Sequence, residues 1–231
     1  MSIEKLLNAV ESSTDDPAEG MADAVTRRLL ERAQRAPSEV VGLTVDTVTE
    51  PLTGTPRMLA IVQLWAESER LDSATAFAAE LTDLPSTDTS TWTSSELVFR
   101  EPTDRQSRVD AHHRVKLIGS AFRRDDFTVD AFFDYWRETH APISGSVPGG
   151  QGYVVSRVHA ATGRRADDGV DGFIELWWPD RATFDAAGAT EQQARAWEDV
   201  GNYAKTTGEF WITHEHVVVP PPPTGPGTLE A

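Results

Sequence analysis

Apolar and polar residues follow the two regular periods of secondary structure, and the order of elements they predict occurs twice along the chain. In the first half, residues with strand composition alternate with two helical stretches. Asp15-Asp16-Pro17 opens the first helix, and Val25, Leu29 and Ala33 recur every four positions within it. Strands are predicted at 3–12, 40–48, 58–65 and about 92–99, and the second helix at 71–81. The order is β-α-β-β-α-β.

The same order begins again after a polar linker. Strands are predicted at 115–122, 153–159, 173–178 and 210–219, and helical segments at 127–140, from 181 and from 190. The capping-box pattern of Thr190-Glu191-Gln192-Gln193 predicts that the last helix starts there.

The helix that begins near Phe127 carries the most informative pattern of the second half. Val129, Phe132, Phe133, Trp136 and His140 fall on one helical face. Because proline disfavours the α conformation of the residue before it, Ala141-Pro142 predicts a helix end near His140 or Ala141. At that end the helix dipole would favour the protonated form of the imidazole.

Short sequence matches show that the two halves are copies of one module. Ile61 to Trp65 aligns with Phe173 to Trp177, and the other matches are Lys5-Leu6 with Lys116-Leu117, Gly42-Leu43 with Gly152-Tyr153, and Ala36-Pro37 with Ala141-Pro142. The predicted organisation is a degenerate N-terminal module at 1–100, a linker at 101–112, a C-terminal module at 113–219 and a Pro-rich flexible tail at 220–231.

Each predicted module is a ferredoxin-like α+β unit, an antiparallel sheet with both helices on one face. Packing the two open faces together would close a barrel of about eight strands, with the helices outside and room for one small ligand. Two strands indicate a mixed inner face, because alternate residues share a side. These sets are Tyr153, Val155, Arg157 and His159 on one strand, and Phe173, Glu175 and Trp177 on the other.

Composition excludes several classes of protein. The 231 residues carry a formal net charge of −16, which would repel nucleic acid and anionic membrane surfaces. No apolar run is long enough to span a bilayer and no signal peptide is recognised, so a cytoplasmic location is expected. The absence of cysteine removes disulfides, thiolate metal sites and a cysteine nucleophile.

The pattern Tyr135-Trp136-x-x-x-His140-x-Pro142, with the strand at Lys116-Leu117-Ile118 and the later strand at Tyr153, resembles the EthD-like family of the dimeric α/β-barrel superfamily. The resemblance covers about 105 residues, the C-terminal half. Such modules usually form the barrel by dimerising, so the chain is similar to a fused dimer, and a homodimer of fused barrels is a further expectation. The resemblance implies a superfamily that includes cofactor-independent monooxygenases of aromatic polyketides, cyclases, decarboxylases and lactone isomerases, as well as haem enzymes. For this chain no cofactor is predicted.

The ionisable candidates lie in the second copy, since the first has no histidine. His140 is the leading acid or base; the alternative is a histidine bonded to a carbonyl in a loop. His214 and His216 point to one side of a strand and could transfer protons, and without a third ligand no metal is predicted. Glu175 interrupts an apolar strand, either as an acid with a raised pKa or as an ion pair with Arg157.

Aromatic and polar residues of the same copy are predicted to bind the substrate: Tyr135, Trp136, Tyr153, Arg157, His159, Trp177 and His216. The predicted function is acid/base chemistry on a small apolar aromatic or polyketide-like carbonyl compound in a barrel cavity. Cyclisation, dehydration, decarboxylation and isomerisation all remain open. A cofactor-free monooxygenase and a non-catalytic binding protein are the alternatives; a closed cavity with converging polar groups favours an enzyme, and a filled barrel favours an accessory role.

Overall fold

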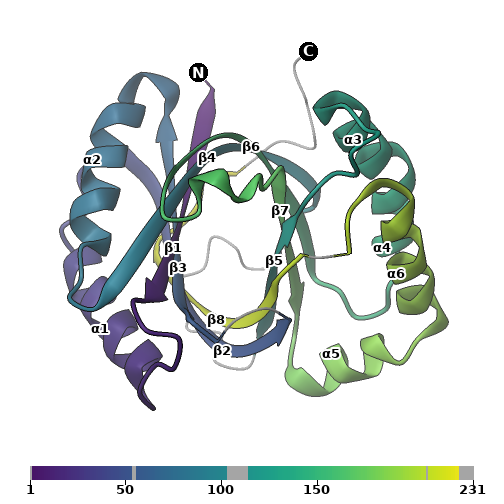
Figure 1. Ribbon diagram of the computed structural model, residues 1–231, viewed down its shortest axis with the longest axis horizontal. Coiled ribbons are helices and arrows are strands. Elements are labelled where there is room, and N and C mark those ends of the chain that lie inside the picture. The colour runs from purple at the N-terminus through teal and green to yellow at the C-terminus, as the bar shows by residue number, and fades with distance from the viewer. Residues whose placement is uncertain (1, 54–55, 103–113, 207, 224–231) are drawn as a thin grey trace.

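Eight antiparallel strands close into a barrel, and the helices lie outside it in two groups on opposite sides (Figure 1). This is a computed structural model that describes residues 2–53, 56–102, 114–206 and 208–223. The strands follow one another around the barrel in the order β1-β3-β2-β8-β5-β7-β6-β4. No helix within these residues has the length and apolar composition needed to cross a bilayer. The predicted fold class is confirmed.

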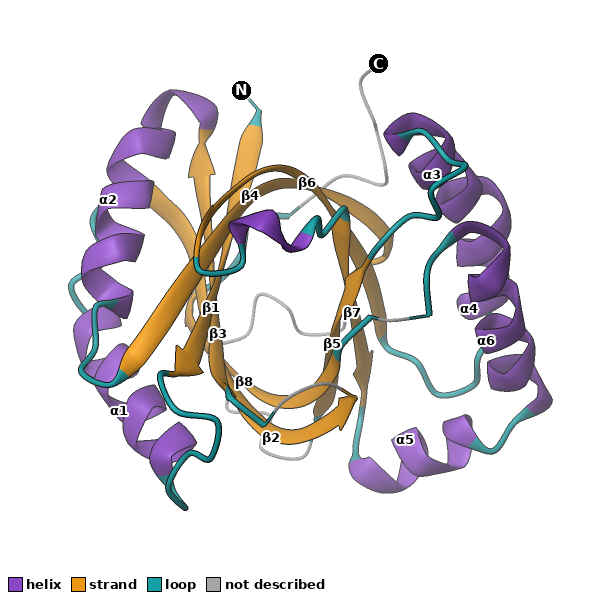
Figure 2. Cartoon of the chain, viewed as in Figure 1, coloured by secondary structure: helices purple, strands orange, loops and turns teal. Residues whose placement is uncertain are grey.

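The first module contains four strands and two helices, and Figure 2 shows both helices on the same side of the barrel. Its elements are β1 (Ile3–Ser12), α1 (Met21–Ala33), β2 (Val40–Thr53), β3 (Met58–Glu67), α2 (Leu71–Thr82) and β4 (Thr87–Arg100). The Ser/Thr-rich residues before Trp92 belong to β4, because each pairs with a residue of β1. That strand therefore begins earlier than its apolar content indicated.

The second module repeats this order with a more elaborate helical layer. Its elements are β5 (Val115–Ala121), α3 (Val129–Tyr135), a π-helical turn (Trp136–His140), α4 (Ala141–Ser144), β6 (Gly152–Gly163), β7 (Gly172–Trp178), α5 (Arg181–Gly188), α6 (Glu191–Tyr203) and β8 (Phe210–Val219). The Thr190 hydroxyl accepts a hydrogen bond from the Gln193 backbone N–H at 3.2 Å, so the predicted cap is present. Most of the predicted linker, 103–112, and the tail from residue 224 lie outside the described residues.

The barrel closes where the two modules meet. Strand β2 pairs with β8, so that Asp46 lies opposite Glu215, and β4 pairs with β6, so that Glu96 lies opposite Ser156. In a dimer these two seams would join separate chains; here they join two halves of one chain. Pro221, at the start of the predicted tail, is buried and its Cα would lie 2.9 Å from a Cβ built on Gly42.

The helix through Pro142 does not end where the sequence predicted. The Ala141 N–H donates to the Trp136 carbonyl, which makes the i→i+5 turn of a π-helix, and α4 continues to Ser144 with Pro142 in its first turn. Proline is tolerated there because it lacks the N–H that a helix start leaves unused. His140 is therefore inside a helical segment, and the repeat match to Ala36-Pro37 fails, since Pro37 follows the end of α1.

The inside of the barrel is filled by side chains, which corrects the expectation of an internal ligand cavity. One end holds an apolar cluster that includes Leu7, Ile61, Trp92, Phe173 and Trp211, with about 0 Å³ of free space among them. Large side chains meet at this end of the barrel and leave no room for a ligand among them. The sequence could not show this, because alternation identifies the inward face without giving the volume that it encloses.

The middle of the barrel holds a buried charge network built from both modules. Lys5 Nζ donates to Glu96 at 2.9 Å and also contacts Glu175. Lys116 Nζ lies 3.1 Å from Asp46, 2.9 Å from Glu175 and 2.7 Å from Glu215. The two lysines hold matching positions in the repeat, and each contacts a carboxylate of the opposite module.

The equivalent residues Gln63 and Glu175 meet across the axis, where Gln63 Nε2 donates to Glu175 Oε2 at 2.9 Å. Glu175 therefore pairs with two lysines and not with Arg157, which contacts Asp130 at 2.7 Å. Burial opposes the charge of Glu175, but Lys116 and Lys5 outweigh it and hold the pKa of its carboxyl well below its usual value. Glu175 is an ionised structural group.

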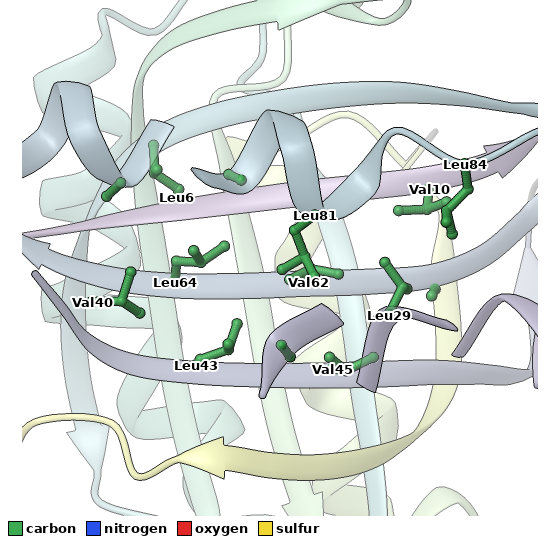
Figure 3. Close-up of a cluster of buried hydrophobic side chains, with 14 of the residues drawn as sticks. Leu6, Val10, Leu29, Val40, Leu43, Val45, Val62, Leu64, Leu81 and Leu84 are labelled. Atoms are coloured by element: carbon green, nitrogen blue, oxygen red, sulfur yellow. The ribbon is translucent and has the colours of Figure 1, made fainter. Parts of the chain in front are cut away.

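The space between the helices and the sheet of the first module is packed. Apolar side chains from α1, α2 and the outer faces of the strands fill this layer (Figure 3). Leu29 and Leu64 are 0% exposed within it. This half supplies four of the eight strands of the barrel wall.

Candidate active site

A pocket of about 340 Å³ lies in the second module, between the helices and the outer faces of β5, β7 and β8. Its volume falls in the range of small-molecule sites. The pocket is mainly apolar, and its aromatic lining residues are Trp136, Trp178, Phe184, Trp197, Tyr203 and Phe210. Leu52 and Trp197, both about half exposed, belong to the lining, so the first module also contributes to the site.

The aromatic face of the α3 segment carries His140 to this pocket. Phe132 and Trp136 are buried on that face, with ring centroids 5.3 Å apart, and His140 follows on the same side and is 3% exposed. A π-helical turn shifts the residues after it relative to a regular α-helix, and such turns occur often at functional sites. Here the turn ends at His140 itself.

Asp199 of α6 is the partner of His140. Its Oδ2 lies 2.9 Å from His140 Nδ1, while its Oδ1 accepts from the Tyr135 hydroxyl at 2.9 Å and from Asn202 Nδ2 at 3.0 Å. Burial opposes the negative charge of Asp199, but the hydrogen bonds from Asn202, His140 and Tyr135 outweigh it and lower the pKa of its carboxyl. Asp199 is thus an anion that accepts a hydrogen bond from Nδ1–H of His140.

The environment keeps His140 neutral. Burial lowers the pKa of its imidazole below the usual 6.5, and the hydrogen bond and charge of Asp199 compensate in part. The expectation that a helix end would favour the protonated form is therefore wrong, both because the helix continues and because burial dominates. A neutral imidazole with Nδ1–H bound to a carboxylate has Nε2 free to accept a proton.

Ser144 lies next to this acceptor nitrogen. Its Oγ lies 3.1 Å from His140 Nε2, and Trp136 Nε1 of the same helical segment donates a hydrogen bond to the Tyr153 hydroxyl at 2.8 Å. Burial raises the pKa of the Tyr153 hydroxyl, which keeps it protonated. His140, Ser144 and Trp136 line the pocket, and Tyr135 and Tyr153 support them from outside the lining set.

The other predicted residues lie elsewhere. Glu175 and Trp177 face the barrel interior. The next residue, Trp178, faces the other way and lines the pocket. The set containing Tyr153, Arg157 and His159 does share one side of its strand, but Tyr153 and Val155 on that side contact the helices, so it is the outer side. Only one of the two predicted inner faces is therefore correct.

His214 and His216 are on the outer surface of β8, away from the pocket-lining residues. Their rings are 4.7 Å apart, and His216 Nε2 lies 3.2 Å from the Thr47 hydroxyl, which donates to Thr26 of α1. Across the described ranges there is no group of three or more His, Cys, Asp or Glu that could hold a metal ion. The structure brings neither histidine to His140.

Sequence reasoning missed Asp199, Ser144 and Tyr203, although one signal was present. Ala196, Asp199 and Tyr203 are the buried residues of α6 and recur at helical spacing. An aspartate on the apolar stripe of an amphipathic helix needs a buried partner, and that rule would have singled it out. Ser144 gave no such signal, because its position depends on a helix that continues through Pro142.

Comparisons with known proteins agree with the expected resemblance. Residues 124–207 match the family model of the EthD domain. Similar solved structures include an anthrone oxidase-like protein (13% identity, 93% of each chain covered, TM-score 0.64) and a proposed monooxygenase from Fusobacterium nucleatum subsp. nucleatum (7% identity, 94% of each chain, TM-score 0.61). A proposed chlorite dismutase is also similar (9% identity, 91% of this chain and 94% of that chain, TM-score 0.52). The search of curated proteins gave no significant match. At these identities the solved structures establish the fold.

Proposed function

We propose that the second module, which matches the EthD domain model over residues 124–207 and forms part of a single-chain α/β barrel, is an enzyme acting on a small, largely apolar aromatic or polyketide-like carbonyl compound. The observation that most supports this proposal is the His140–Asp199 pair, with Nδ1 and Oδ2 2.9 Å apart, on the wall of an aromatic pocket of about 340 Å³. Planar apolar compounds suit such walls, because ring faces and edges supply most of the contact area. The first module is its structural partner.

His140 is the proposed general base. A proton leaves a carbon next to the carbonyl, or a phenolic hydroxyl, and is accepted at Nε2; the electron pair left on a carbon is delocalised onto the carbonyl oxygen as an enolate. The Ser144 hydroxyl bonds Nε2 and lines the pocket, so the proton passes through that hydroxyl or the hydroxyl rotates aside. Asp199 then stabilises the imidazolium that forms.

The enolate is common to the reactions that the sequence left open. Cyclisation, dehydration, decarboxylation and isomerisation would all use His140 as acid or base without a cofactor. Oxygenation is the second candidate, favoured by the descriptions of two similar structures, an anthrone oxidase-like protein and a proposed monooxygenase. For an anthrone-type substrate, loss of a proton gives a carbanion that reacts with O₂; the CH₂ group becomes a carbonyl and one water is released.

A panel of small aromatic carbonyl compounds that includes anthrone tests this proposal. We expect at least one compound to bind and to be converted, with oxygen uptake if the reaction is oxygenation and none if it is a rearrangement or decarboxylation. Calorimetry measures binding, and an oxygen electrode with product analysis measures turnover. Binding without conversion would favour the accessory role, and neither binding nor conversion across the panel would contradict the proposal.

The pH dependence of the converted compound tests the state of the base. Because burial lowers the pKa of His140, kcat/KM should rise with pH along an acid limb whose midpoint is below 6.5 and stay level above it. The same shift makes the folded protein bind fewer protons than the unfolded chain. The stability contributed by His140 is therefore complete above about pH 6.5 and is lost as the pH falls through the folded-state pKa. An acid limb with its midpoint above pH 6.5 would contradict the role of His140 as a buried general base.

A further inference from the structure

Asp199, His140 and Ser144 form a continuous hydrogen-bonded series along one wall of the pocket. Asp199 Oδ2 lies 2.9 Å from Nδ1 of the imidazole, and Ser144 Oγ lies 3.1 Å from Nε2. The carboxylate fixes the proton on Nδ1, so the Ser144 hydroxyl donates its hydrogen to Nε2. A serine activated by a base that a carboxylate orients is the arrangement that makes a hydroxyl nucleophilic.

Ser144 is the member of this series that a ligand would meet. It is half-buried and lines the pocket, whereas His140 is only 3% exposed. Its place at the last position of α4, four residues after the histidine, results from the helix continuing through Pro142.

We propose that Ser144 is a nucleophile that accepts acyl groups, which gives the pocket an esterase activity toward small esters of apolar or aromatic acids. This activity goes beyond the proposed function and shares with it only the pocket and its base. Both chemistries need a neutral His140; acyl transfer always needs an oxygen atom at position 144, whereas the carbonyl chemistry can proceed without it when the substrate reaches Nε2 directly.

The reaction has two balanced halves. Ser144 Oγ forms a bond to the ester carbonyl carbon while its proton moves to His140 Nε2, and the ester C–O bond then breaks as His140 returns that proton to the leaving alcohol. Water next gives a proton to Nε2 and attacks the acyl carbon, which releases the carboxylic acid and restores the serine.

The residues that line the pocket determine which acyl groups it can accept. The pocket walls near the serine include Trp136, Leu176 and Trp178, with no acidic side chain among the pocket-lining residues. An acyl group with a single ring or a short chain would fill much of about 340 Å³. A positively charged acyl group would lose its hydration without an acidic partner.

A small alkyl fluorophosphonate, read by mass spectrometry of the intact full-length protein and its peptides, tests the proposal without a known substrate. We expect one phosphonyl adduct on Ser144, with fluoride released, and a burst of nitrophenol when p-nitrophenyl acetate is added. Ser144→Ala should lose the adduct and the burst. Ser146→Ala is the matched control, because that serine is exposed nearby and bonds the Ile143 carbonyl; it should react like the original protein.

The proposal also requires that the reaction of Ser144 depend on His140. His140→Gln should slow labelling of Ser144 by roughly 100-fold or more. A protein that is not labelled at Ser144, or a His140→Gln protein labelled at an undiminished rate, would overturn the nucleophile. The proposed function has separate readouts: turnover of a carbonyl compound by Ser144→Ala leaves it intact, whatever the probe shows.

Discussion

Lys116→Met is expected to destabilise the folded protein by about 3–5 kcal/mol, because it leaves several buried carboxylates facing one another without their cation. Lys116 is 1% exposed and contacts Asp46, Glu175 and Glu215. Burial opposes its charge, but these three carboxylates outweigh that effect and raise the pKa of its ammonium. Methionine keeps most of the apolar stem and removes only the charge. Urea unfolding at pH 7 measures the loss.

The pH dependence of this loss distinguishes charge from packing. Burial already raises the pKa of Asp46 to about 7. Without Lys116 the pKa of Asp46 rises further above its unfolded value, and the lowered pKa values of Glu175 and Glu215 rise as well, so relative to the original protein the variant regains stability as the pH falls and loses it as the pH rises. The control is Arg195→Met, which breaks an exposed pair with Glu191 and should cost under about 1 kcal/mol at any pH. A loss for Lys116→Met that is equal at pH 5 and pH 8 would contradict the electrostatic explanation.

His140→Gln is expected to lower kcat/KM by about 10²- to 10⁴-fold for any compound that the protein converts, the usual effect of removing a general base. Glutamine can retain a hydrogen bond to Asp199, so the fold and the pocket should survive. The variant should also lose the acid limb of the pH profile, since the group that titrates is gone.

Glu138→Gln is the matched control for this change. Glu138 lies in the same π-helical turn, its side chain is 70% exposed, and it pairs with Arg137. It should keep the original kcat/KM. Steady-state kinetics of both variants, with circular dichroism to confirm folding, give the comparison. Turnover by His140→Gln within threefold of the original rate would remove His140 from the chemistry.

The sequence identified the fold because each module must bury one face of its sheet. Apolar alternation and the matches of Lys5 with Lys116 and of Trp65 with Trp177 were enough to predict two modules and a closed barrel. They could not show what fills the interior. In the sequence, Lys5 and Lys116 are single charged residues near the start of a predicted strand. Only the closed barrel brings them to carboxylates of the opposite half.

From the sequence, His140 and the aromatic residues on its helical face could be predicted as part of the site, but its hydrogen-bonding partners could not. His140 and Trp136 share a helical face, which periodicity reveals. Asp199 is 59 residues away and Ser144 lies beyond a proline that is expected to end a helix, so their meeting with His140 depends on tertiary packing. Glu175 was misassigned because a buried carboxylate in a strand has the same pattern whether it is an acid or an ion pair.

A crystal structure of the protein with anthrone, or with a tighter-binding member of the panel, tests most directly where the chemistry takes place. We expect density for the ring system between α6 and the outer face of β7, with a polar atom of the ligand within hydrogen-bonding distance of Ser144 or His140. Density inside the barrel, or against the helices of the first module, would contradict the assignment of the site.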